Sequence, residues 1–463
     1  MVNEYLFCFS LCYNILMNII FGILVGIVVM TIVVTIHEFG HFIAARRSGV
    51  AVKEFGIGFP PKAIAWLHVP RDEVKKYCKK FGYSEKKSEK ILKKLERYPK
   101  KQWFFIPLPK SEWYEEKNNE VSLKSQDYLI FSLNWLPIGG FCQMDGENNS
   151  DRRKGTFGAA SLWQKTKILF AGVTMNWLLA IVILTGLAAT SGIPEILEHQ
   201  FYLENDTKID NSSLSILVSD VIKDTPAEKG GIKGSDILLE GKYEDETVEF
   251  NSVSSLQEFN KNHAGKPVTY KVLRGNKEET VSVKLNDTSS EYLLGISMGQ
   301  MGIKKFKMTW SAPITATVNT LQFTGETFRG LGDLVVNVFS GITSQFSSNE
   351  AVKNAGKQKI EAAGDAVAGP VGIIGVLFPQ VAESGLAEVL LLAAIISISL
   401  ACMNVLPIPA LDGGRWLLII IFEKILRRKL TPETENKIVS RAFVTLLILA
   451  ALITVLDVIK IIR

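Results

Sequence analysis

The segment His37-Glu38-Phe39-Gly40-His41 ends a run of residues, 14–36, that contains no charged side chain. On a helix, the spacing H-E-x-x-H places two imidazoles one turn apart on the same face, where they can hold zinc beside a glutamate that serves as general base. The preceding run is long and apolar enough to cross a bilayer. Ionisable side chains in a membrane segment are costly and mark a functional site. The combination indicates hydrolysis within a membrane or at its edge.

The composition of the chain is neither that of a disordered protein nor that of an ordinary soluble enzyme. Of 463 residues, 47% are hydrophobic and 21% are charged, and the mean hydropathy is +0.18. The net charge of +5 is too small to indicate nucleic acid as a partner. Five cysteines without C-x-x-C spacing argue against a disulfide framework and a cysteine-zinc site. The N-terminus lacks the basic region and cleavage site of a signal peptide, so we expect the first apolar run to be retained.

Four apolar segments predict a multi-pass α-helical membrane protein. They lie in 1–48, 166–191, 386–441 and 442–463, with a cytoplasmic region at 49–165. Lys and Arg cluster after the first segment, before the second and between the third and fourth, whereas all charged residues in 192–205 are acidic. Because positive charge favours the cytoplasmic side, 192–385 is expected outside an inner or plasma membrane. Lys460 and Arg463 at the outer end depart from this rule.

The outer segment contains a β-rich block at 212–300, with short alternating strands between Gly, Asn and Lys turns. Residues 221–239 resemble a PDZ domain of the bacterial protease type: Pro226-Ala227 opens a short helix and Asp236-Ile237 leads into a strand. Ser235 stands where those domains usually have glycine. PDZ domains bind peptides by strand addition, which makes a peptide C-terminus a candidate partner. A packed β domain without a ligand is the alternative.

Two further segments are expected to lie in solvent or on the membrane surface. The insertion at 71–127 holds 16 Lys and Arg against 10 Asp and Glu, and it predicts two short amphipathic helices separated at Gly82. A solvated hairpin and a hairpin whose basic face attracts anionic lipid both remain open. Residues 301–385 are expected to form an extracytoplasmic linker and amphipathic region, with glycine interruptions in 311–346 and an exposed linker at 349–365. The apolar stripes of the two helices are Val74, Tyr77 and Phe81, then Ile91, Leu92 and Leu95.

Two imidazoles and a water leave a tetrahedral zinc site one protein ligand short. Asp412 is the best candidate, because it follows the third apolar run after two prolines that break the helix at membrane depth. The alternative is a buried polar network that only holds helices together. The other histidines, which fall in loops or in the outer domain, are His68, His199 and His263.

The first motif, together with Asn404-x-x-Pro407-x-Pro409-x-Leu411-Asp412-Gly413-Gly414, resembles the site-2 protease family of intramembrane zinc metalloproteases, in its bacterial regulator-of-sigma-E protease (RseP) branch. The resemblance covers the chain nearly end to end, except 71–127 and part of 347–366. It implies about four transmembrane helices with an inserted PDZ-like β-rich extracytoplasmic domain and a membrane-associated β-loop. The segments that match that branch are 55–61 (its glycine-rich strand), 135–144 (its β-loop), 171–176 (the start of helix two) and 369–373 (before helix three).

The resemblance also implies a role for each site residue. Zn²⁺ would be held by His37, His41 and Asp412, while Glu38 would move the proton as catalytic base. Asn404 would contact the substrate backbone. The β-loop would pair with the substrate as an added strand through Gly139, Gly140 and Phe141, although a plain turn explains the two glycines equally well.

The expected activity is cleavage of transmembrane segments of single-span proteins already trimmed outside, such as anti-sigma factors or signal-peptide remnants. The partners would be that substrate and the lipid bilayer. One alternative is a catalytically silent membrane scaffold that presents a PDZ domain. Another is a transporter with an ion site on the broken helix, which predicts an internal repeat that the sequence does not contain.

Overall fold

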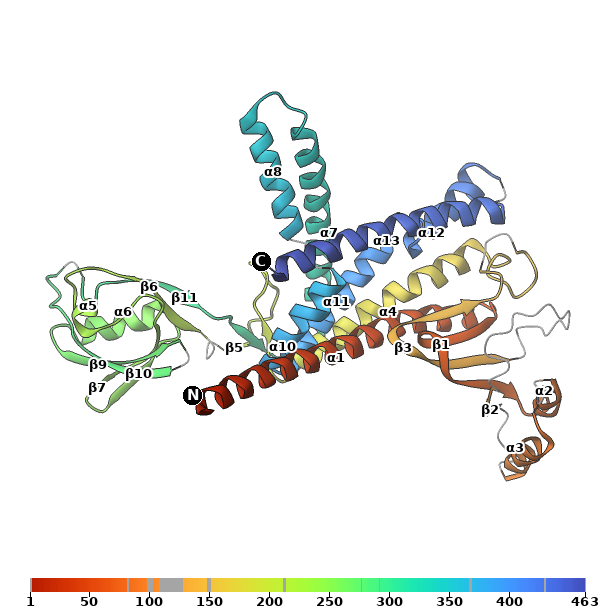
Figure 1. The fold of residues 1–463 in the computed structure, drawn as a ribbon, viewed down its shortest axis with the longest axis horizontal. Coiled ribbons are helices and arrows are strands. Elements are labelled where there is room, and N and C mark those ends of the chain that lie inside the picture. Colours follow the sequence, from red (N-terminus) through yellow and green to blue (C-terminus); the bar gives the residue numbers. More distant parts are fainter. Residues whose placement is uncertain are drawn as a thin grey trace. The chain divides into compact units, whose positions relative to one another are not determined.

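The structure is a computed structural model that describes residues 2–80, 83–97, 103–108, 128–147, 151–210, 214–275, 277–290, 292–365, 369–428 and 430–462. The chain forms two compact units, one of 1–183 with 320–463 and one of 184–319 (Figure 1). The helix end predicted at Gly82 and the apolar position Phe81 lie outside the described residues.

Among the described residues, four helices are long and apolar enough to cross a membrane, as the sequence predicts. They are α1 (Val2–Arg47), α4 (Leu162–Ala189), α11 (Leu386–Val405) and α13 (Pro432–Ile462). Two arginines in the last turn of α1 suit the negative end of its dipole, and Gly49, with φ of 76°, then turns the chain. α13 begins well before the predicted apolar segment, because the polar residues that precede that segment continue the helix.

A small antiparallel sheet of order β2-β1-β3 lies beside the C-terminal half of α1 (Figure 1). It consists of β1 (Val52–Pro70), β2 (Trp103–Pro107) and β3 (Leu129–Met144). Both long strands fold back on themselves, so that residues 52–57 pair with 140–144 on one side and residues 54–57 pair with 130–133 on the other. His68 lies on β1 and stacks on Trp103 of β2, so the prediction that it falls in a loop is wrong. The sheet is therefore larger than the β-loop that the sequence indicates.

The two helices predicted in the basic insertion are present as α2 (Val74–Lys80) and α3 (Glu85–Arg97). Val74 and Tyr77 are fully buried in a core that they share with β1 and β2. Ile91 of α3 packs against the same core. The hairpin is thus attached to the sheet through its apolar face, and its lysines cover the polar side.

Residues 312–365 form two helices, where the sequence suggested an interrupted segment and a linker. α7 (Ala312–Ser344) runs continuously through its glycines, and α8 (Glu350–Asp365) replaces the linker predicted at 349–365. That prediction is wrong because Asn349 starts the helix by accepting a hydrogen bond from the backbone N–H of Ala351. A Cβ at Gly341 would lie 2.9 Å from the carbonyl oxygen of Gly356, so glycines permit the close contact of α7 with α8.

A short apolar helical segment precedes α11 and packs against α1. It consists of α9 (Pro370–Gly372), the π-helical turn η2 (Ile373–Leu377) and α10 (Phe378–Ser384). A Cβ at Gly22 would lie 2.2 Å from Cα of Pro379, and one at Gly26 would lie 2.8 Å from the ring of Phe378. Glycines on α1 therefore make room for this segment, which the sequence places in an amphipathic linker region.

The second unit contains the β-rich block that the sequence predicts, in the form of a six-stranded sheet. The main path of the sheet is β10-β9-β7-β6-β11, and β8 pairs with β7. Ser235, the departure noted in the sequence, has φ of 72°, a conformation that favours glycine. The elements are β6 (Ser215–Val221), α5 (Pro226–Gly230), β7 (Ile237–Tyr243), β8 (Glu246–Glu249), α6 (Val253–Asn262), β9 (Pro267–Arg274), β10 (Lys277–Lys284) and β11 (Ile296–Met301).

A second, smaller sheet completes this unit. It has the order β4-β12-β5 and consists of β4 (Ile193–Pro194), β5 (Lys208–Asp210) and β12 (Lys305–Lys307). Asp206 accepts hydrogen bonds from the backbone N–H groups of Thr309 and Ser311, which precede α7. The carboxylate thereby fixes the chain where it enters that helix.

Candidate metal centre

The H-E-x-x-H segment lies within α1, and its two imidazoles face the same point. Nε2 of His37 and Nε2 of His41 are 3.1 Å apart, and both side chains are buried. Oδ2 of Asp412 lies 3.1 Å from Nε2 of His37 and 3.3 Å from Nε2 of His41. Three donor atoms thus meet at the corners of a nearly equilateral triangle.

This triangle has the dimensions of a zinc site. With zinc–ligand bonds of about 2.0–2.1 Å in a tetrahedral arrangement, two ligand atoms lie about 3.3 Å apart. The observed separations of 3.1, 3.1 and 3.3 Å match that value. Two imidazole nitrogens and one carboxylate oxygen are also a ligand set that zinc accepts with one position left for water. The residues therefore fit the metal.

The other nitrogen of each imidazole contacts α4. Nδ1 of His41 lies 2.8 Å from the carbonyl oxygen of Ile168, which accepts its proton and leaves Nε2 free as a donor to metal. Nδ1 of His37 lies 3.3 Å from the side-chain amide of Asn176, and the backbone carbonyl oxygen of Asn176 accepts a hydrogen bond from the hydroxyl of Ser397 on α11. Three membrane helices are therefore joined around the two histidines.

Gly172 is the point at which α4 approaches both rings. A Cβ at this residue would lie 2.6 Å from Nε2 of His37 and 2.6 Å from Nε2 of His41. Only a glycine leaves the volume between the imidazoles and α4 open. The sequence assigned 171–176 to the start of the second helix without identifying this contact.

Asp412 is presented by a break between two helices, as the prolines predict. α11 ends at Val405, and Asp412 is the first residue of α12 (Asp412–Ile420), which continues into the π-helical turn η3 (Ile421–Ile425). A Cβ at Gly413 would lie 2.1 Å from the carbonyl oxygen of Val405, and one at Gly414 would lie 1.9 Å from that of Ile408. The two glycines let α12 begin directly against the turn, which brings the carboxylate to the histidines.

A cavity of about 250 Å³ opens at this centre. Glu38 and Asn404 line it with the three donor residues, as do Cys142 and Met144 of β3. Gly139, Gly140 and Phe141 do not line it. Gly139 has φ of 79°, and the Phe141 ring packs over Gly56. Both residues therefore shape the fold of β3. The structure thus brings together five of the eight predicted site residues.

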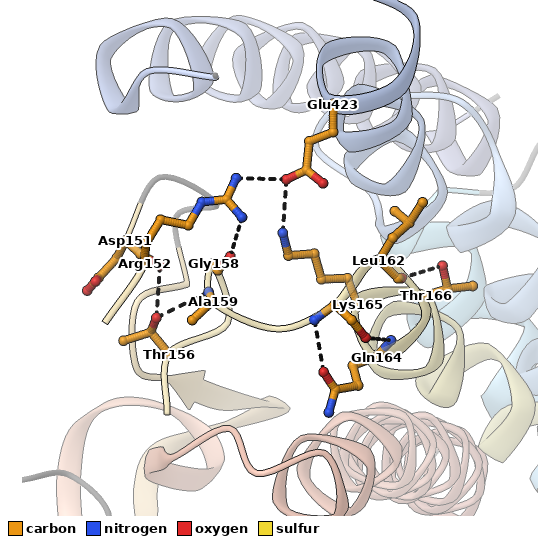
Figure 2. A network of polar contacts seen from close by, with 11 residues as sticks. Asp151, Arg152, Thr156, Gly158, Ala159, Leu162, Gln164, Lys165, Thr166 and Glu423 are labelled. Carbon is orange, nitrogen blue, oxygen red and sulfur yellow. Dashed lines mark hydrogen bonds and ion pairs between the residues drawn. The ribbon is translucent and has the colours of Figure 1, made fainter. Parts of the chain in front are cut away.

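Ion pairs hold α12 and η3 to α4 and to the segment between β3 and α4. Glu423 of η3 accepts from Nζ of Lys165 at 3.0 Å and from Nη2 of Arg152 at 2.9 Å (Figure 2). The Lys165 side chain is only 1% exposed. Closer to the cavity, Nη1 of Arg415 lies 3.1 Å from Oε1 of Glu147. Because α12 also carries Asp412, these contacts position the third donor.

Sequence reasoning missed Asn176, Arg415 and Glu423. Asn176 carried a usable signal, because an amide within an otherwise apolar membrane helix is costly unless it has a task. Arg415 and Glu423 carried none, since a basic residue and an acidic residue after a membrane segment are ordinary features. The backbone carbonyl of Ile168 is invisible in any sequence.

A zinc site on a membrane helix with an acidic residue in its motif defines a membrane metalloprotease. The profile of Peptidase family M50 matches residues 25–74 and 120–450, and the chain belongs to this family. The predicted resemblance to the site-2 proteases is thereby confirmed, as are the zinc cofactor and the assignment as an integral membrane protein.

Three relatives illustrate the similarity. The regulator of sigma-W protease RasP of Bacillus subtilis (strain 168) is 26% identical over 444 residues, 90% of this chain and 93% of that protein. The zinc metalloprotease RasP of Bacillus licheniformis is 26% identical over 446 residues, 90% and 94% of the two chains. That of Oceanobacillus iheyensis is 24% identical over 460 residues, again 90% and 94%. Their names give no support to the alternatives of a silent scaffold or a transporter.

Proposed function

We propose that this zinc metalloprotease cleaves the transmembrane segments of single-span proteins whose outer domains have already been removed. The observation that carries the proposal is the position of the three donor atoms and Glu38 in one cavity at the end of a membrane helix. An enzyme for soluble peptides has no need to place its site there, since polar groups in a membrane helix are costly.

In this proposal each residue of the centre has one task. His37, His41 and Asp412 hold zinc, which supplies Lewis-acid activation of a water molecule and of the scissile carbonyl. Glu38 takes the proton of the attacking water and passes it to the leaving amide nitrogen. Asn404 lies across the same cavity on α11, where its amide can hydrogen-bond the substrate backbone.

Residues 140–144 of β3, which we call its second limb, suggest how the substrate is unfolded. A helical segment resists hydrolysis because its carbonyls are hydrogen-bonded, so it must become extended. Residues 140–144 pair with β1 on one side, while Cys142 and Met144 of this limb line the cavity. A substrate that adds to the other side as a strand would pass the metal in an extended form. The backbone of Gly139, Gly140 and Phe141, rather than their side chains, would make the pairing.

We further propose that the second unit is a PDZ-like domain outside the membrane that selects trimmed substrates. The sheet order ends at β11, and α6 contacts this edge strand, which is where an added peptide strand would lie. The outer position rests on the distribution of Lys and Arg along the chain. The name of the Bacillus subtilis relative, a regulator of sigma-W protease, favours anti-sigma factors as substrates. Remnant signal peptides are the second substrate class.

Glu38→Gln and Asp412→Ala test the roles together. The full chain is reconstituted in vesicles with a single-span model substrate, and cleavage and bound zinc are both measured. Glu38→Gln should retain one zinc per chain and lose about 10²–10⁴-fold in cleavage rate, which is the usual contribution of a general base. Asp412→Ala should lose both zinc and activity.

Two outcomes would contradict the proposal. Wild-type activity in Glu38→Gln would remove this residue as the base. If the enzyme cleaved a soluble peptide but not the membrane substrate, it would still be a protease, but transmembrane segments would be rejected as its substrate class.

A further inference from the structure

A second cavity, of about 410 Å³, lies between α1 and α4. We call it the α1–α4 groove. Its apolar part is lined by residues that recur at helical spacing on the two facing surfaces, among them Ala44 of α1 and Phe170 and Thr174 of α4. Its polar end is lined by Arg47 of α1 and Lys167 of α4. The groove thus combines an apolar channel with two cations at one end.

Among the described residues, no carboxylate neutralises the two cations at this end of the groove. Arg47 and Lys167 are exposed, and neither forms an ion pair with a carboxylate in the part of the chain that the structure describes. Trp163 also lines this end, is 66% exposed, and has its ring centroid 5.2 Å from Nζ of Lys167. An exposed tryptophan beside a lysine at the end of a membrane helix is typical of the level of the lipid headgroups.

We propose that the α1–α4 groove binds one anionic phospholipid. Its phosphate lies between Arg47 and Lys167, and one acyl chain follows the apolar part over Ala44 and Thr174. Charge complementarity selects the anionic headgroup, and the membrane depth of both helices selects a lipid tail rather than a soluble ligand. The proposal does not depend on which substrate the enzyme cleaves.

The position of the groove connects the lipid to the metal centre. Gly40, which lies between the two histidines in the sequence motif, also lines the groove. A Cβ at Gly40 would lie 2.4 Å from the carbonyl oxygen of Ala171, so α1 and α4 are in close contact at this level. A lipid in the groove therefore packs against the same pair of helices that positions His41 through Ile168.

Native mass spectrometry of the full chain in detergent, titrated with phosphatidylglycerol or phosphatidylcholine, tests the site. The wild type should bind one phosphatidylglycerol in preference to phosphatidylcholine. The double variant Arg47→Gln/Lys167→Gln should bind it roughly thirtyfold more weakly, since each basic residue contributes roughly a factor of five toward anionic lipid. The matched control Arg46→Gln/Lys154→Gln removes two exposed charges that do not line the groove, and it should stay within about twofold of the wild type.

The variant Thr174→Trp separates a lipid from a free anion. It fills the apolar part of the groove and leaves both cations in place, so it should weaken phosphatidylglycerol binding, and excess inorganic phosphate should not displace the lipid from the wild type. Equal losses in the two double variants would assign the binding to general surface charge and overturn the proposal. Wild-type binding in Thr174→Trp would do the same, as would displacement of the lipid by a transmembrane peptide that lacks acidic residues.

Discussion

Gly172 on α4 lies directly against the ring of His37 on α1, so that a Cβ at residue 172 would be only 2.6 Å from Nε2 of that histidine. Side-chain carbons do not approach ring atoms so closely, and α4 also contacts the Nδ1 atom of each ring. Gly172→Ala must therefore displace an imidazole or separate the helices. We expect zinc affinity to fall about 10–100-fold, as for other changes that misorient a ligand. Competition with a fluorescent zinc chelator measures this directly.

The same helix supplies a matched control. Gly186 has nothing within 4 Å of the position where its Cβ would lie. Gly186→Ala should therefore leave zinc affinity unchanged. Equal zinc affinity in Gly172→Ala and Gly186→Ala would show that α4 does not approach the two histidines as closely as described.

Asn176 should fix the orientation of His37. When Nε2 holds a metal, Nδ1 carries the proton and needs an acceptor. Oδ1 of Asn176 has no hydrogen-bond partner among the described residues, while Nδ2 lies 3.3 Å from Nδ1 of His37. Rotation of the amide exchanges the two atoms and provides the acceptor. Asn176→Leu removes it and should lower zinc affinity about 10–100-fold.

Asn176→Asp retains an acceptor of the same length and should bind zinc more tightly than Asn176→Leu. Both variants are compared with Ser397→Ala, which loses only the hydrogen bond to the backbone of residue 176. Equal zinc affinity in Asn176→Leu and the wild type would exclude a role for the amide in orienting His37.

The metal donors could be predicted from the sequence because each sits in a pattern with a local physical cause. His37 and His41 are one helical turn apart, and Asp412 follows prolines that must end a membrane helix. The four apolar helices follow from composition alone. In the second unit, alternation identifies strands such as 268–272 without any knowledge of their partners.

What could not be predicted depends on partners distant in sequence. β2 is a five-residue strand in a basic insertion, and only its pairing with β1 makes it a strand. α8 reads as a polar linker because its stability comes from contact with α7 at Gly341 and Gly356. The contacts of Gly172 with both histidines have no local signal, since glycine in a membrane helix is common.

Glu423 should contribute to stability because it neutralises a buried lysine. The Lys165 side chain is 1% exposed and Glu423 is 20% exposed, with 3.0 Å between Nζ and Oε1. Glu423→Gln leaves the ammonium group without this anion. Removal of one partner of a buried pair costs about 3–5 kcal/mol, and partial exposure of Glu423 places the expected loss near the lower value. Hydrogen exchange of α12 and residues 151–161 in the full chain measures it.

The control for this change is an exposed ion pair between a glutamate and a basic residue of the same helix. Glu326 of α7 pairs with Arg329 at the surface, with side chains 44% and 70% exposed. Glu326→Gln should change stability by about 0–1 kcal/mol. Similar small effects from both substitutions would show that Glu423 does not hold η3 in place.

Asp236 should make the stability of the second unit depend on acid. Its side chain is 1% exposed and accepts from Nε and Nη2 of Arg274 at 2.8 and 2.7 Å and from the backbone N–H of Lys233. Burial alone would raise the pKa of Asp236, but these hydrogen bonds outweigh it and hold the pKa below its ordinary value. Because the folded state favours the ionised form, the stabilisation is present above the unfolded pKa of about 3.9 and is lost as the pH falls through the folded value.

Asp236→Asn removes this charge at every pH. At pH 7 it should destabilise the unit by about 1.5–3 kcal/mol, the range for hydrogen bonds to a charged group. The difference from the wild type should shrink as the pH falls from about 5 toward 2, since the wild type then loses the same charge. Hydrogen exchange of β6, β7 and β9 in the full chain reports both effects. Asp245→Asn, at an exposed turn, should change neither, and a difference between Asp236→Asn and the wild type that stayed constant with pH would assign the loss to packing instead of charge.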